Sequence, residues 1–69
     1  MQLGWIVEVE HEDGPLLYAA RVHDPIEAEN VVRNSFNIKE DIDVIAVRPL
    51  NADVIERLYI GEGEILGPM

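Results

Sequence analysis

The chain has few hydroxyl, thiol or amine side chains that could act as nucleophiles. It holds one serine, Ser35, one lysine, Lys39, two histidines, and no threonine or cysteine. Nucleophilic catalysis needs a hydroxyl, thiol or amine beside a base. Ser35 falls on the inward side of a predicted helix without a glycine-flanked turn, so we expect a packed, hydrogen-bonded serine. The absence of cysteine excludes disulfides, thiolate zinc sites and iron–sulfur clusters.

Both histidines have a structural explanation that is simpler than a catalytic one. His11 stands in a predicted turn with Glu12 and Asp13, where a loose divalent-metal site could form, but the spacing does not match an EF-hand loop. His23 directly precedes Asp24, which is the predicted cap of a helix. The five glycines form neither a dinucleotide-binding nor a phosphate-binding loop. We therefore predict no catalytic residue, no metal site and no cofactor.

The charge of the chain excludes another class of partner. Fourteen Asp and Glu residues against five Lys and Arg residues give a formal net charge of −9 over 69 residues. Such a field repels DNA, RNA and anionic membranes. No stretch approaches the roughly 18 apolar residues of a membrane span, and Glu8 interrupts the first apolar run. We expect a soluble cytoplasmic protein that binds neither nucleic acid nor membrane.

The N-terminal third predicts a hairpin of two strands, Trp5 to Glu10 and Leu16 to Val22, joined by a loop of about four residues. Pro15 argues against a two-residue Asp-Gly turn, because proline lacks the N–H that would close it. The expected pairing joins Val7 to Tyr18 and separates two faces. The core face is wholly apolar, and it comprises Leu3, Trp5, Val7, Val9, Leu16, Tyr18, Ala20 and Val22. The second face is half apolar, and it comprises Ile6, Glu8, Glu10, Leu17, Ala19, Arg21 and His23.

A helix after the hairpin carries the clearest local signals. Asp24 is a suitable cap, Pro25 suits the first helical position, and Glu27 completes a capping box. The helical period gathers five residues on one inward stripe, namely Ala28, Val31, Val32, Ser35 and Phe36. Glu29 and Arg33 stand four residues apart in the order that favours an ion pair. We expect this helix to cover the core face.

The remaining segments complete an α+β domain of two layers in the order β-β-α-β-α. A third strand is predicted over 42–48, ended by Pro49, with both faces apolar at its centre. A short helix follows over 51–60, capped by Asn51, with Val54, Ile55, Leu58 and Tyr59 as its apolar stripe and Gly61 as its stop. An alternative reads 58–60 and 64–66 as two short strands. We predict a domain over 1–61, a three-stranded sheet in the order 2-1-3, and a flexible tail over 62–69.

The second face leads to the functional hypotheses. Large apolar patches are uncommon on monomers, so this face must be covered by the short helix, by the tail or by another molecule. The leading hypothesis is a non-enzymatic module that binds a protein partner or a second copy of itself. Its expected interaction face comprises Ile6, Glu8, Leu17, Ala19 and Arg21. The alternatives are an acidic mimic of nucleic acid that inhibits a basic partner, and a metal binder or small enzyme built on His11 or His23.

Overall fold

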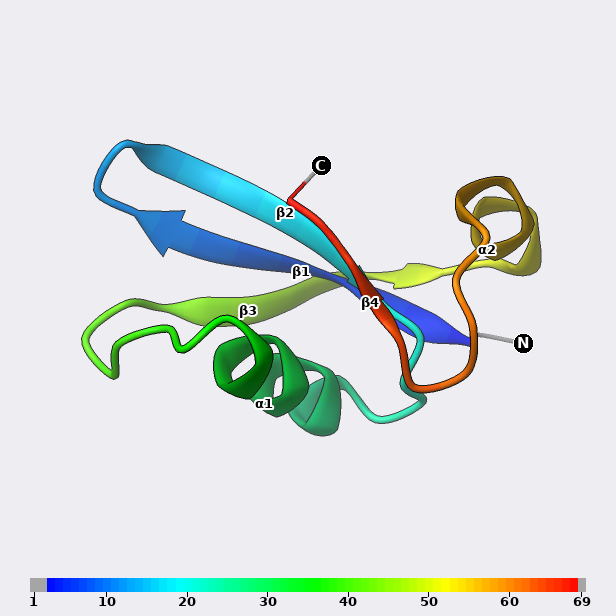
Figure 1. The fold of residues 1–69 in the computed structure, drawn as a ribbon, viewed down its shortest axis with the longest axis horizontal. Coiled ribbons are helices and arrows are strands. Elements are labelled where there is room, and N and C mark those ends of the chain that lie inside the picture. The colour runs from blue at the N-terminus through cyan, green and yellow to red at the C-terminus, as the bar shows by residue number, and fades with distance from the viewer. Residues whose placement is uncertain (1–2, 69) are drawn as a thin grey trace.

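The computed structural model describes residues 3–68 and shows an α+β fold with one antiparallel sheet and two helices (Figure 1). The sheet has four strands in the order β3-β1-β2-β4. The elements run along the chain as β1 Gly4–His11, β2 Gly14–Ala20, α1 Pro25–Ser35, β3 Val44–Leu50, α2 Ala52–Leu58 and β4 Ile65–Leu66. The predicted class, the hairpin and the order 2-1-3 of the first three strands are confirmed, and a fourth strand is added.

The β1–β2 hairpin has the predicted register. Val7 faces Tyr18, and the ladder continues through Val9 opposite Leu16 to His11 opposite Gly14. The expected four-residue loop is therefore reduced to two unpaired residues, because its outer residues join the strands. Gly14 has a φ of +122°, a conformation that glycine adopts without steric cost.

Helix α1 begins as predicted and covers the core face. The Asp24 carboxylate accepts a hydrogen bond of 3.3 Å from the Glu27 backbone N–H. Ala28 and Val32 are fully buried against the sheet. The first core cluster comprises Val7, Val9, Tyr18, Ala20, Ala28, Val32 and Val44. Leu3 does not join it, since this residue precedes β1 and packs on the other side of the sheet.

Strand β3 begins and ends two residues later than predicted. It pairs antiparallel with β1 and so runs parallel to β2, as the β-α-β connection requires. Pro49 lies inside the strand, opposite Trp5. Proline is accepted there because β3 is an edge strand and its outer backbone positions need no partner strand. The register shifts between Ile6 and Val7, which leaves Val47 as an additional residue in β3.

Helix α2 packs on the second face, at the end of the sheet far from the β1–β2 turn (Figure 1). The Asn51 side chain accepts a 2.9 Å hydrogen bond from the Val54 backbone N–H, which confirms the predicted cap. The helix is shorter than expected, because Tyr59 adopts a left-handed conformation with a φ of +55°. Tyr59 is consequently 92% exposed. Ile60 is buried instead of Tyr59, which was expected to belong to the apolar stripe of the helix. Among the described residues, no helix is long and apolar enough to cross a membrane.

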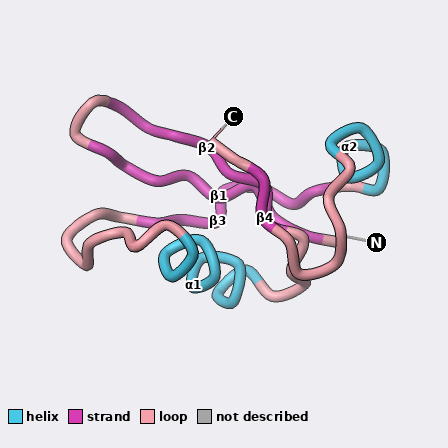
Figure 2. Tube along the Cα trace, viewed as in Figure 1, coloured by secondary structure: helices cyan, strands magenta, loops and turns pink. Residues whose placement is uncertain are grey.

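The segment expected to form a tail contributes β4, which completes the sheet beside β2 (Figure 2). Ile65 pairs with Ala20 and Leu66 with Ala19. The Arg21 backbone N–H donates to the Glu64 carbonyl oxygen at 3.0 Å, and the Arg21 carbonyl oxygen accepts from the Gly63 N–H at 3.0 Å. Two residues of the expected tail, Ile65 and Leu66, are therefore part of the sheet. The alternative of two strands at 58–60 and 64–66 is correct only for its second strand.

Candidate functional site

Two of the five residues predicted to form an interaction face are inside the protein. Ile6 is 5% exposed and Ala19 is fully buried. They form the second core cluster with Leu50 of β3, with Ile55 of α2 and with Ile60, which follows the C-cap of α2. The short helix thus supplies cover for this part of the second face. Ile6 and Ala19 cannot contact a partner without displacement of α2, and we remove them from the candidate surface.

Arg21 also has a structural explanation. Its guanidinium Nη1 donates a 3.0 Å hydrogen bond to the Ile60 carbonyl oxygen, and the residue is half-buried. Its backbone holds the segment before β4. Arg21 therefore connects β2 to the end of α2 and to the chain that follows it.

The other two predicted residues, Glu8 and Leu17, are half-buried, and Leu17 packs against the margin of the second core cluster. They pair directly across β1 and β2, and Ile45 of β3 lies opposite Glu8 on its other side. The three side chains form a row across three strands because cross-strand partners share a face. Figure 1 shows no helix over this end of the second face.

Two exposed apolar side chains lie in or beside this row. Ile45, at one end of it, is 46% exposed, and Leu66, beside Ala19 in the next row, is 39% exposed. We call the surface formed by Glu8, Leu17, Ile45 and Leu66 the open face. The apolar pattern of 42–48 already indicated that β3 needs cover on both sides. Leu66 could not be assigned from sequence, because a two-residue strand has no periodicity to detect.

Carboxylates crowd the turn-proximal margin of the open face. A hydrogen bond with the Glu8 side chain and repulsion from the Glu8 charge raise the pKa of Glu10 above its ordinary value, with smaller contributions from desolvation and Asp43. Glu10 is exposed. The cross-strand partners of Glu8 are Leu17 and Ile45, and the β2 partner of Glu10 is Pro15. No lysine or arginine occupies these positions, so the repulsion is not relieved within the sheet.

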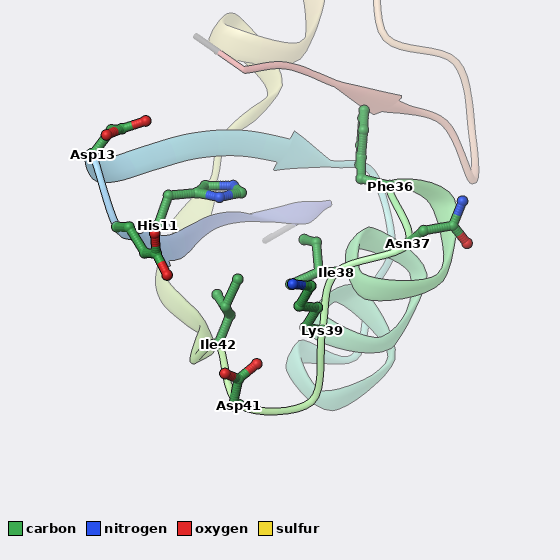
Figure 3. Close-up of a pocket in the computed structure, with 9 residues that line it drawn as sticks. His11, Asp13, Phe36, Asn37, Ile38, Lys39, Asp41 and Ile42 are labelled. Atoms are coloured by element: carbon green, nitrogen blue, oxygen red, sulfur yellow. The ribbon is translucent and has the colours of Figure 1, made fainter.

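A cleft of about 380 Å³ lies between the β1–β2 turn and the loop from α1 to β3 (Figure 3). It is lined by His11, Glu12, Asp13, Phe36, Asn37, Ile38, Lys39, Asp41 and Ile42. Figure 3 shows the His11 ring extending inward from β1, whereas Asp13 and Asn37 point outward. The cleft thus brings the one histidine of the turn close to the one lysine of the chain.

His11 is the unusual residue of this cleft, because its Nε2 atom is buried and has no hydrogen-bond partner. An unpaired buried nitrogen costs free energy, but its burial also keeps it from meeting a ligand in the cleft. Within residues 3–68, no group of three or more His, Asp and Glu side chains could hold a metal ion. His11 therefore contributes to the cleft wall with one ring nitrogen buried and unpaired.

The other residues considered for chemistry lie at the surface. His23 is exposed, and only its carbonyl oxygen is engaged, by the Trp5 indole N–H at 2.9 Å. Ser35 is exposed as well, which corrects its predicted inward position. Ser35 is the last residue of α1, and in the last turn it is Val32 that is buried in the first core cluster.

The open face is accordingly the surface whose residue types lack an explanation within the fold. It can supply an apolar contact area bordered by negative charge, and it carries no group suited to covalent chemistry. No protein-family model matches the chain, and no curated protein or solved structure with which it was compared matches it either.

Proposed function

We propose that this chain is a non-enzymatic protein-interaction module that binds its partner through the open face. The observation that carries the proposal is a set of partly exposed apolar side chains on one side of the sheet, namely Ile45 on β3, Leu17 on β2 and Leu66 on β4. A single exposed apolar residue needs no explanation, but several on the same face of one sheet are typical of a surface that another molecule covers.

The size of the domain supports the same proposal. A chain of about this length buries only about 60% of its unfolded surface. The second face is covered by one helix of seven residues, at one end. A partner on the remaining part would bury the side chains that α2 leaves exposed, and its binding would stabilise the folded state by mass action.

The contact is made by the face of the sheet and not by its edges. The outer edge of β2 is paired with β4 at Ala19 and Ala20. On the outer edge of β3, the Ala46 backbone N–H donates a 2.8 Å hydrogen bond to the Glu29 carboxylate. The additional residue Val47 and the proline at position 49 interrupt the same edge. Carboxylates, bulges and prolines are the devices by which edge strands avoid pairing with another chain.

The acidic-mimic alternative has less support from the arrangement of the charges. A mimic of nucleic acid requires its carboxylates on one face. Asp24 and Glu27 begin α1, Asp53 lies on α2, and Glu10 lies on the second face of the hairpin. These positions belong to both sides of the sheet and to both ends of the molecule.

Site-specific photocrosslinking in the native host tests the proposal. A benzophenone amino acid placed at position 45 should give a discrete crosslinked protein of defined mass. The same residue at position 26 is the matched control, because Ile26 is 65% exposed but lies on α1, away from the open face. Equal products from both positions, or none from position 45, would show that the open face is not a binding surface.

A further inference from the structure

We infer that the open face is occupied by a basic amphipathic segment of another protein, whose apolar side chains pack on Ile45, Leu17 and Leu66 while its lysines or arginines meet Glu8 and Glu10. The inference rests on the proposed function and specifies the chemistry of the partner. It is carried by the position of the carboxylates relative to the apolar row.

The apolar part of the surface determines the form of the partner. Ile45, Glu8 and Leu17 lie directly opposite one another on three strands, and Leu66 extends the next row on β4. This arrangement presents apolar side chains on both sides of one acidic residue. A segment that presents apolar side chains on one side, with basic ones at their border, is complementary to it.

The charged part of the surface determines the sign of the partner. Glu8 is half-buried in the middle of its row, Glu10 follows it on the same face, and the Glu10 backbone N–H bonds to the Asp43 carbonyl oxygen at 3.0 Å. Three carboxylates therefore lie near one another where the cross-strand neighbours supply no cation. A lysine or arginine from a partner relieves this repulsion and also gains from the net charge of −9, which steers cations toward the protein.

A second copy of the chain does not fit these charges. In a symmetric dimer the same patch of each copy meets its equivalent. Burial of the open face against itself would bring Glu8 and Glu10 of one copy near those of the other, in addition to the repulsion between two net charges of −9. Like charges facing each other across an interface disfavour association strongly.

Among the described residues, no lysine or arginine is a direct cross-strand partner of Glu8 or Glu10. Arg21 bonds to Ile60, and Arg33 bonds to the carbonyl oxygens of Lys39 and Ile42 at 2.7 and 2.9 Å. Lys39 lines the cleft between the turn and the loop. Arg57 lies in the last turn of α2. Arg48 of β3 lies opposite Ile6, in the cross-strand row next to the row that contains Glu8.

The test uses three synthetic amphipathic peptides as probes, titrated into the isotope-labelled full chain and followed by amide chemical shifts. The first alternates leucine with lysine, the second carries glutamate at the lysine positions, and the third carries serine at the leucine positions. We expect the first peptide to shift the amides of residues 8, 17, 45 and 66, and we expect the other two to bind at least about tenfold more weakly.

Two double variants with equal change in net charge separate a local effect from bulk attraction. E8Q/E10Q should weaken binding of the leucine–lysine peptide about tenfold, whereas E56Q/E62Q, which alters exposed residues elsewhere, should weaken it less than about twofold. Preserved dispersion of the amide chemical shifts confirms that a variant is folded. If E8Q/E10Q does not fold, the single variant E10Q replaces it in the comparison.

Three results would overturn the inference. If both double variants weakened binding of the leucine–lysine peptide equally, the binding would be due to the net charge of the protein and not to Glu8 and Glu10. Equal binding of the glutamate peptide would show that the open face does not select for charge. A crosslinked product at position 45 with twice the mass of the chain would identify a second copy as the occupant, which would retain the proposed function and reject the basic partner.

Discussion

At the scale of single residues, two side chains whose spacing predicts an ion pair within the helix instead bind to other parts of the chain. Glu29 and Arg33 stand four apart on α1, but Glu29 accepts from the Ala46 N–H of β3 and Arg33 donates to two carbonyl oxygens of the loop that follows α1. An exposed ion pair on a helix contributes about 0.3–0.5 kcal/mol, and a charge-assisted hydrogen bond to the backbone contributes about 1.5–3 kcal/mol. The stronger interactions prevail because β3 and its preceding loop pack beside the helix.

The Glu8–Glu10 pair predicts a specific pH dependence of stability. The pKa of Glu10 is raised in the folded state above its ordinary value of 4.5, so the folded protein binds more protons than the unfolded one between the two pKa values. The free energy of unfolding should therefore rise as pH falls through this window. E10Q should be more stable than the wild type at neutral pH, with an advantage that disappears below 4.5.

Urea denaturation of both proteins at a series of pH values measures this difference. E62Q is the control, because Glu62 is exposed in the turn before β4 and lies outside the Glu8–Glu10 pair. An E10Q curve parallel to that of the wild type at every pH would contradict the assigned repulsion.

At the scale of elements, caps predict where helices begin better than stripes predict where they end. Asp24 and Asn51 cap α1 and α2 as their residue types indicate. The apolar stripe of the second helix extends through Tyr59, but the chain leaves the helix at this residue and turns Ile60 inward. The Ile60 N–H bonds to the Ile55 carbonyl oxygen at 3.4 Å, which closes the helix end.

Replacement of Tyr59 by glycine should therefore stabilise the folded protein. A non-glycine residue in the left-handed region costs about 1–2 kcal/mol, and the Tyr59 ring, which is 92% exposed, contributes little packing. We expect Y59G to raise the free energy of unfolding by about 1 kcal/mol in urea denaturation. Y59A keeps the same steric penalty and should give no comparable gain. An equal gain from both variants would point to the loss of the tyrosine ring as the cause.

At the scale of the whole molecule, the sheet separates two clusters that different parts of the chain complete. Helix α1 completes the first cluster, and α2 with Ile60 completes the second. Ile65 of β4 packs against the first cluster, although it is close in sequence to the segment that completes the second. The C-terminal segment therefore crosses from one side of the sheet to the other and joins both layers.

This role predicts that Ile65 is part of the folded domain. I65A removes apolar contacts from a half-buried site and should lower the free energy of unfolding by roughly 1–2 kcal/mol. E62A, three residues earlier and exposed, should change it by less than about 0.5 kcal/mol. Thermal or urea denaturation distinguishes the two. Wild-type stability in I65A would mean that residues 62–69 act as the tail that the sequence suggests.

The sequence by itself determined the features that depend on neighbouring residues and on simple periods. These are the hairpin register, the two caps, the strand order 2-1-3 and the second face as the surface that needs cover. Only the tertiary structure decided how that face is divided, with Ile6 and Ala19 buried in the second core cluster and Glu8 and Leu17 only half-buried. The physical reason is that a short helix and a two-residue strand are stabilised by long-range packing and pairing, which local patterns do not encode.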